Sequence, residues 1–274
     1  MTTISRLGNA VLARVGLRLE RVRAPDPEDL RGHDDFYRPA PTCQIPELAT
    51  LYRLFLGERN DGLFVEVGAY DGISFSNSSC LADAGWNGIL IEPIPRFAQA
   101  CRDRYHGNAR IQVVDAAVGD TAADVEFTIA GPFTSTNDDV IRGYERLDWA
   151  KEAVKNSTRL TVRQRILDEI LAASGAEGKA IDVLIVDVEG AEASVFAGFS
   201  LEKWMPTMII VELSHTHPDL HDISAGDAAV QRSIANAGYA VVYKDRINTV
   251  FVADEPSLKK RPAPGADLRR IAEV

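Results

Sequence analysis

The sequence has no apolar run of about 18 residues, the length that a membrane-spanning helix requires. It also has no continuous apolar stretch near its start, because arginines interrupt the apolar residues there, so a signal peptide is not expected. Cysteine is scarce: the only ones are Cys43, Cys80 and Cys101, which are scattered and form no C-x-x-C pair. This usage indicates reduced thiols and a cytoplasmic protein.

Basic residues are also fewer than acidic ones. The 274 residues include 30 Lys and Arg against 40 Asp and Glu, which gives a net charge of −10. A general nucleic-acid-binding protein usually carries a basic surface, so no nucleic-acid partner is expected. The hydrophobic content of 46% is large enough, in a chain of this length, to form a sizeable core.

The N-terminus departs from this acidic balance. Residues 1–24 contain five arginines and a single acidic residue, Glu20. Their apolar side chains recur at helical spacing, which predicts a basic amphipathic helix. Such a helix either binds peripherally to an anionic membrane, here the inner face of the cytoplasmic membrane, or packs its apolar stripe on the protein itself.

The G-x-G-x-x-G fingerprint of dinucleotide-binding proteins is missing as well. Its nearest counterpart is FVEVGAYDG, residues 64–72, in which Tyr70 occupies the position of the second glycine. The stretch has the form of a buried strand that runs into a tight turn, which is where open α/β sheets bind nucleotides. An NAD-linked sugar-modifying enzyme is therefore an alternative that this turn disfavours.

Strands and helices alternate along most of the chain. The predicted strands are 63–67, 88–92, 110–118, 124–129, 181–188, 207–213, 239–244 and 248–253, and the predicted helices are 46–56, 75–84, 95–105, 162–173, 191–197 and 226–238. This alternation predicts an α/β fold with a mostly parallel sheet and helices on both faces. The last two strands are close enough to form a hairpin, so one of them is antiparallel.

Composition suggests how the chain is organised. We expect a basic helix at 1–24, a linker and leading helix at 25–59, the main α/β domain at 60–254 and a charged tail at 255–274. Within the main domain, residues 131–160 form an unusually long connection.

Each central strand of this prediction ends in a carboxylate. The residues concerned are Glu66, Glu92, Asp115, Asp187 and Glu212. In open α/β sheets, ligands bind beyond the carboxyl ends of the strands. A carboxylate buried there without partners costs several kcal/mol, so these residues predict a ligand that offers cationic groups or hydroxyls.

The positions of these carboxylates favour one cofactor. Glu92 lies about 20 residues beyond the glycine turn, where a carboxylate accepts the two hydroxyls of a ribose. Asp115, one strand further, is placed to accept from the amino group of adenine, and Gly68 lets the backbone approach a ligand closely. Asp71 would repel a pyrophosphate but not a cationic amine and sulfonium. The turn therefore predicts S-adenosylmethionine rather than NAD.

Several stretches resemble the successive motifs of FkbM-type methyltransferases. They are FVEVGAYDGISFSNSSCL, LIEP, DAAVGD, IDVLIVDVEGAEASVFAGF and IIVEL, which span roughly residues 60–213, with a looser resemblance to 253. The GAYDG…SN variant is similar to the Star-like branch of the family, and Gln44 resembles a glutamine that precedes the first strand there. The resemblance implies a Rossmann-like class I fold, a seven-stranded sheet with one antiparallel strand, and S-adenosylmethionine as cofactor. It also implies an acceptor hydroxyl on a sugar, glycolipid or glycosylated natural product.

The resemblance also implies a set of cofactor-binding residues. These are Glu66, Gly68, Ala69, Tyr70, Asp71, Asn77, Glu92, Asp115, Ala116 and Asp187. Asn77 lies where the first helix meets the turn, so it either contacts the methionine end of the cofactor or caps the helix.

A sugar hydroxyl is a poor nucleophile, so a base or a metal ion should assist the removal of its proton. The candidates beyond the fourth and fifth strands are Asp187, Glu189, Glu212, His215 and His217. His215 or His217 acts as the base beside Asp187, or is an ordinary surface-loop residue. Alternatively, Asp187 and Glu212 hold Mg²⁺ through their carboxylate oxygens.

The long connection at 131–160 is interpreted as a lid over the acceptor. Tyr144 and Trp149 within it either stack on a sugar ring or pack inside a helical insert. Three further alternatives remain open: a protein acceptor, a small phenol as acceptor, and a non-catalytic protein that retains the fold. The intact series of strand-end carboxylates argues against the last of these, because a scaffold has no need to keep buried charges.

Overall fold

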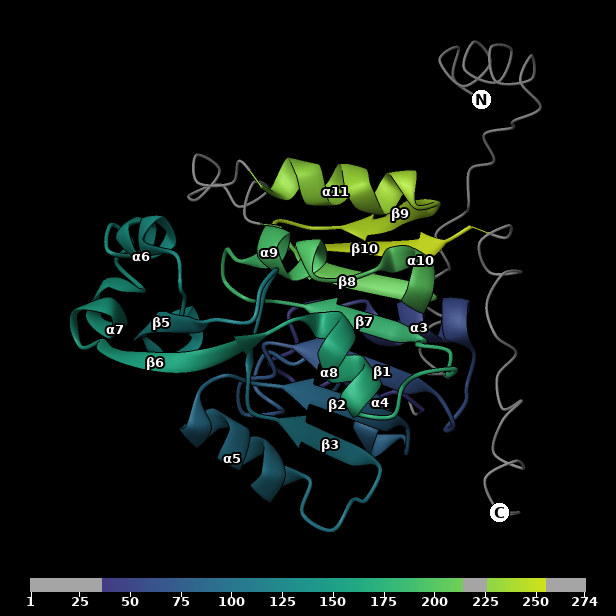
Figure 1. Cartoon of the computed structure of the whole chain (residues 1–274). Helices are drawn as coiled ribbons and strands as arrows, with labels where there is room; N and C mark the ends of the chain where they lie inside the picture. The colour runs from purple at the N-terminus through teal and green to yellow at the C-terminus, as the bar shows by residue number, and fades with distance from the viewer. Residues whose placement is uncertain (1–35, 214–225, 255–274) are drawn as a thin grey trace, which may run out of the picture. The chain divides into compact units, whose positions relative to one another are not determined.

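A seven-stranded sheet forms the centre of the computed structural model, which describes residues 36–213 and 226–254 (Figure 1). In spatial order the strands are β3 (Ile111–Val114), β2 (Asn87–Ile91), β1 (Leu63–Val67), β7 (Val183–Val186), β8 (Met208–Glu212), β10 (Asn248–Ala253) and β9 (Tyr239–Lys244). Of these seven strands, only β10 runs against the others, paired antiparallel with both β8 and β9. The predicted Rossmann-like α/β fold, with one antiparallel strand from a C-terminal hairpin, is confirmed.

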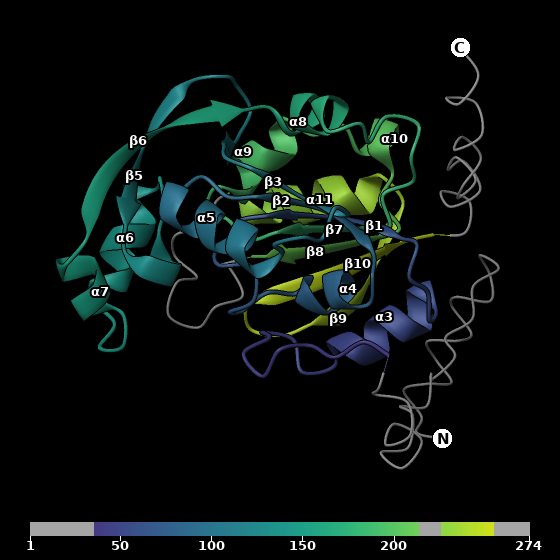
Figure 2. The same cartoon turned by 90° about the horizontal axis from the view of Figure 1, so that it is seen from below.

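Helices cover both faces of this sheet (Figure 2). One face packs against α8 (Leu167–Ala173), α9 (Glu192–Ala197), α10 (Leu201–Trp204) and α11 (Asp227–Asn236). The other packs against α3 (Leu48–Leu56), α4 (Ser79–Asp83) and α5 (Pro95–Arg104). The strands β1 and β7 are buried along their whole length, as expected for parallel strands that are covered on both sides.

Two sequence predictions are wrong in the middle of the chain. Residues 110–118 are not one strand, because β3 ends at Val114 and Ala117–Val118 form a separate strand, β4. Residues 162–165 are not helical either, because they belong to β6 (Thr158–Arg165). Of the helix predicted at 162–173, the part that is helical is α8. The strands β4, β6 and β5 (Asp124–Ile129) make a second sheet in the order β4-β6-β5.

The physical reason lies in tertiary pairing. β6 pairs antiparallel with β5 from Thr158 to Arg163, and its Leu160 and Val162 pack near the buried Phe127 of that strand. Backbone pairing and burial of alternate side chains therefore outweigh the helical preference of the segment.

The helix in the structure is shorter than the one predicted at 75–84, because α4 begins at Ser79. The segment before it is a turn, in which Tyr70 and Phe75 have positive φ angles of 49° and 61°. The Ser76 hydroxyl accepts hydrogen bonds from the backbone N–H groups of Ser78 and Ser79. Such side-chain bonds compete with helical ones and favour turns.

The connection at 131–160 contains the short helix η2 (Gly131–Phe133), α6 (Asp138–Tyr144) and α7 (Lys151–Lys155). These helices enclose a small core of their own. Figure 1 shows them beside the end of the main sheet at which the parallel strands terminate. We call residues 131–157 the insert from here on.

Some predictions fall outside the described residues. They concern the basic helix at 1–24, the histidines His215 and His217, and the tail at 255–274. Within the described part of the chain, no helix combines the length and apolar character that crossing a bilayer would need.

Candidate active site

A cavity of about 330 Å³ opens beyond the carboxyl ends of β1, β2, β7 and β8, with the insert as its outer wall. Most of the predicted cofactor residues line it: Glu66, Gly68, Ala69, Tyr70, Asn77, Glu92, Ala116 and Asp187. The structure therefore brings together side chains that are up to 121 positions apart in the sequence, from Glu66 to Asp187.

Gly68 begins the turn after β1, and the site depends on its missing side chain. Its φ angle is +90°, and a Cβ atom there would lie 1.8 Å from the backbone oxygen of Asp187. The N–H of Gly68 donates to the carbonyl of Ile91 at 2.9 Å, which ties the turn to β2. Only glycine permits this close approach of the ends of β1 and β7.

Glu66 lies inside β1 with its carboxylate almost completely buried. It accepts hydrogen bonds from the hydroxyls of Ser78, at 2.7 Å, and Ser76, at 3.2 Å. Burial nevertheless raises the pKa of Glu66 to about 7. A buried carboxylate that titrates near neutral pH is well suited to a cationic ligand, because the cation would stabilise its ionised form.

Glu92 lies at the end of β2 and is held rigidly. One carboxylate oxygen accepts the N–H of Tyr70 at 2.9 Å, and the other accepts the N–H of Ile94 at 2.8 Å. Burial raises the pKa of Glu92 to about 7. Each oxygen keeps a second lone pair, so the carboxylate can still accept two hydroxyls from a ligand in the cavity.

Two predicted cofactor residues do not line the cavity. Asp71 instead closes its own turn by accepting the N–H groups of Ile73 and Ser74. Asp115 is exposed and forms an ion pair with Arg102. Asp115 does not line the cavity in this structure, and its contact with adenine stays a prediction.

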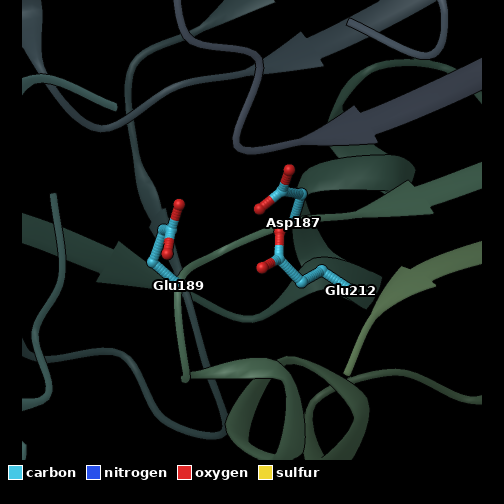
Figure 3. Close-up of side chains that lie close together, drawn as sticks. All are labelled: Asp187, Glu189 and Glu212. Carbon is cyan, nitrogen blue, oxygen red and sulfur yellow. The ribbon is translucent and has the colours of Figure 1, made fainter. Parts of the chain in front are cut away.

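Three carboxylates meet beyond β7 and β8, and Figure 3 shows them close together. Asp187, Glu189 and Glu212 each offer an oxygen, and these oxygens lie within 4.8 Å of one another. Burial raises the pKa of all three groups. Asp187 and Glu212 share a hydrogen bond, so one proton is held between these two carboxylates.

The chemistry of these three carboxylates allows two functions. Grouped carboxylate oxygens are the ligands that Mg²⁺ prefers, and the predicted metal pair of Asp187 and Glu212 is extended here by Glu189. Without an ion, the three carboxylates share protons among themselves and can accept a proton from a substrate.

Asn77 and Gln44 connect the leading segment to this site. Both Asn77 and Asn248 donate from their side-chain nitrogens to Oε1 of Gln44, at 3.4 Å and 3.3 Å. Because its oxygen is engaged twice, the amide nitrogen of Gln44 is left to bond to Asp187. The N-cap of α4 is Ser78, so the interpretation of Asn77 as a helix cap is wrong.

The cavity also has an aromatic wall on the insert, formed by Phe133, Tyr144 and Trp149. The ring centroid of Phe133 lies 5.0 Å from that of Tyr144 and 5.3 Å from that of Trp149. Tyr144 is buried in the core of the insert, whereas Trp149 is 56% exposed. Phe133 and the apolar residues Phe97 and Phe127 also line the cavity, and the sequence did not predict them, since an isolated phenylalanine carries no pattern that distinguishes a cavity from a core.

Comparisons with known proteins give one extensive match. A family model described as "Methyltransferase FkbM domain" matches residues 66–239, more than half of the chain. Among curated proteins, none matches the sequence.

Similar solved structures include an O-methyltransferase from Bacillus cereus in complex with SAH, with 12% identity, a TM-score of 0.43, and coverage of 93% of this chain and 92% of that chain. A putative caffeoyl-CoA O-methyltransferase from Staphylococcus aureus has 12% identity, a TM-score of 0.42, and coverage of 90% and 100%. Aeropyrum pernix fibrillarin with natively bound S-adenosyl-L-methionine has 10% identity, a TM-score of 0.37, and coverage of 72% and 67%. Because these TM-scores are low, the assignment of the chain depends on the family match.

Proposed function

The chain belongs to the FkbM family of S-adenosylmethionine-dependent methyltransferases, and from this premise we propose that it methylates a hydroxyl of a sugar, glycolipid or glycosylated natural product. The observation that carries the proposal is the composition of the cavity described above. Buried carboxylates line its inner half, an aromatic wall lines its outer half, and three carboxylates lie at the junction.

The inner half fits S-adenosylmethionine. Glu92 is placed to accept the ribose hydroxyls, and Glu66 and Asp187 attract the cationic amine and sulfonium. Ala116 and the rings of Phe97 and Phe127 offer an apolar surface to the adenine. When bound, the cofactor supplies a methyl carbon that is already activated for displacement, so the protein has mainly to position the acceptor.

The outer half supports a hydroxyl-bearing acceptor. The exposed ring of Trp149 and the neighbouring Phe133 can stack on the apolar face of a sugar ring, while carboxylates accept its hydroxyls. A small phenol or a protein side chain is the alternative acceptor. Membership of this family disfavours an NAD-linked enzyme.

Asp187 is the carboxylate that we assign as the base. A hydrogen bond from the amide nitrogen of Gln44 favours the ionised form of Asp187, and we assign the proton that Asp187 shares with Glu212 to Glu212. When the methyl carbon exchanges its bond to the cofactor's sulfur for a bond to the acceptor oxygen, a neutral thioether would leave and the proton of the acceptor hydroxyl would pass to Asp187. His215 and His217, which lie outside the described residues, stay as predicted alternatives for this role.

The proposal is tested by turnover with a panel of glycosides, phenols and peptides. We expect methylation of a glycoside hydroxyl, and we expect Asp187→Ala to lower kcat at least 100-fold while the affinity for S-adenosylmethionine changes much less. Methyl transfer to nitrogen or carbon, or to peptides alone, would contradict the proposed acceptor. Full turnover by Asp187→Ala would remove Asp187 as the base.

A chelator distinguishes the two functions of the carboxylates. If Asp187, Glu189 and Glu212 hold Mg²⁺, which would lower the pKa of a bound hydroxyl, activity is lost with EDTA and restored by Mg²⁺. If they act by sharing protons, EDTA leaves turnover unchanged.

A further inference from the structure

The turn that follows β7 has a backbone conformation that its surroundings must hold. Glu189 has a φ angle of +54°, in the left-handed region that side chains other than glycine seldom adopt. Gly190, the next residue, has a φ angle of +95°. A carboxylate-bearing residue kept in such a conformation beside a cavity is a candidate for function, provided that specific contacts fix it.

The insert supplies those contacts. The hydroxyl of Ser135 donates to the backbone oxygen of Glu189 at 2.6 Å, and the hydroxyl of Tyr144 donates to Oε2 of its carboxylate. The helix α6 packs directly on the turn, since a Cβ atom on Gly190 would lie 2.5 Å from Cγ2 of Val140. The insert therefore determines where the Glu189 carboxylate points.

The opposite side of the turn is held as well. The carboxylate of Glu192 accepts the N–H of Val188 at 3.1 Å and that of Gly190 at 3.2 Å. With both sides fixed, Glu189 has little freedom to move independently of the insert.

Tyr144 belongs at the same time to the aromatic wall. Its ring centroid lies 5.0 Å from that of Phe133 and 6.0 Å from that of Trp149. A phenylalanine could fill this place in the core of the insert, so packing alone does not explain the hydroxyl. The hydroxyl is directed at Glu189, which makes Tyr144 the link between the aromatic wall and a carboxylate.

We infer that Tyr144 is a positioning residue for Glu189, and that Glu189 orients the acceptor by accepting a hydrogen bond from an O–H or N–H group beside the hydroxyl that reacts. Tyr144 engages Oε2, so Oε1 is the oxygen assigned to the acceptor. The insert then binds the acceptor through Phe133 and Trp149 and also orients it through Tyr144 and Glu189. This inference rests on the proposed function, because it requires a hydroxyl-bearing acceptor.

A double-mutant cycle tests the link between the two residues. We expect Tyr144→Phe and Glu189→Gln each to lower kcat at least 10-fold, with the affinity for S-adenosylmethionine within 2-fold of the original. The double variant should be no slower than Glu189→Gln alone, because Tyr144 acts only through Glu189. Glu189→Asp serves as a second variant if Glu189→Gln lowers the melting temperature strongly.

Tyr239→Phe is the matched control. Tyr239 is also buried, and its hydroxyl also donates a hydrogen bond, at 2.8 Å to the carbonyl of Pro206, but it does not line the cavity. We expect its kcat to stay within 2-fold of the original. A purely structural role for Tyr144 predicts that Tyr144→Phe behaves in the same way.

The cycle is measured with whichever glycoside, phenol or peptide gives the highest turnover, so a wrong sugar assignment does not affect it. Unchanged kcat in Tyr144→Phe, or effects of the two substitutions that multiply in the double variant, would overturn the inference. A protein that binds S-adenosylmethionine but methylates none of these classes would overturn the proposed function and this inference together.

Discussion

Glu66 and Glu92 are the residues at which the free-energy cost of burying a carboxylate in the site is clearest. Each is buried and titrates near pH 7 instead of near its ordinary value of 4.5. Their burial therefore costs free energy in the ligand-free protein, and a ligand that stabilises the ionised forms recovers part of that cost. This makes the affinity for a cationic, hydroxyl-bearing ligand sensitive to both residues.

Replacement of Glu92 by Ala should weaken the binding of S-adenosylmethionine by about 2 kcal/mol, or about 30-fold, since a hydrogen bond to a charged group contributes this much. Isothermal titration measures the change. Asp124→Ala is the matched control, because Asp124 is exposed, pairs with Arg163 and does not line the cavity, and its affinity should be unchanged. Equal affinities for all three proteins would exclude Glu92 as a ribose ligand.

The pKa values also predict how stability depends on pH. Between about pH 4.5 and pH 7, the folded protein holds protons on Glu66 and Glu92 that the unfolded chain releases. The free energy of unfolding therefore falls as pH rises through this window. The ligand-free protein should melt at a lower temperature at pH 8 than at pH 6, as scanning calorimetry would show.

Binding should follow the opposite trend. Because the ligand favours the ionised forms of Glu66 and Glu92, whose pKa values are both about 7, its Kd should decrease from pH 6 to pH 8 by about tenfold for each of the two residues. The Glu92→Ala variant should lose the tenfold change that Glu92 contributes and keep that of Glu66. A Kd that is independent of pH in the original protein would contradict the assigned ionisation.

Among the structural elements, the turn after β1 leaves the least room for an added side-chain atom. Gly68→Ala should destabilise the protein by several kcal/mol and abolish cofactor binding, because the new methyl group would overlap the backbone of Asp187. Gly57→Ala separates this clash from backbone strain: its φ angle is also positive, at +72°, but a Cβ atom added there would meet no atom within 4 Å. Gly57→Ala should lower the free energy of unfolding only by its backbone strain, on the order of 1–3 kcal/mol. Similar melting temperatures for the two variants would contradict the close approach of Gly68 to the backbone of Asp187.

The insert is the element that we expect to determine the acceptor. Trp149→Ala should raise the KM for the acceptor about tenfold, with little change in the affinity for S-adenosylmethionine, because an exposed stacking ring is lost. Leu54→Ala removes another large exposed side chain, 68% exposed on α3 and outside the cavity lining, and should change neither constant. An unchanged KM for Trp149→Ala would assign the aromatic wall to packing alone.

For the whole molecule, the cavity is built entirely from residues at and beyond Gln44 within the described part of the chain. A protein that lacks residues 1–24 should therefore bind S-adenosylmethionine as tightly as the full chain. The full chain should sediment with anionic vesicles at low salt and the shortened one should not, since the five arginines are lost. Equal sedimentation of the two would contradict the membrane prediction.

What the sequence by itself determined is the local part of this architecture. Apolar runs such as LFVEV and VLIV set the central parallel strands, because only strands covered on both faces bury such runs completely. Gly68 and the carboxylates at the strand ends could also be predicted, since the carboxyl ends of parallel strands meet at one edge of a sheet.

The tertiary structure decided everything that depends on pairing between distant segments. β6 is a strand because β5 and β4 lie on either side of it, and the ion pair of Asp115 with Arg102 forms between a strand end and the helix α5. The hydrogen bonds from Tyr144 to Glu189 and from Asn248 to Gln44 join residues 45 and 204 positions apart. Local propensity carries no information about such contacts, because the free energy that favours them appears only when the chain has folded.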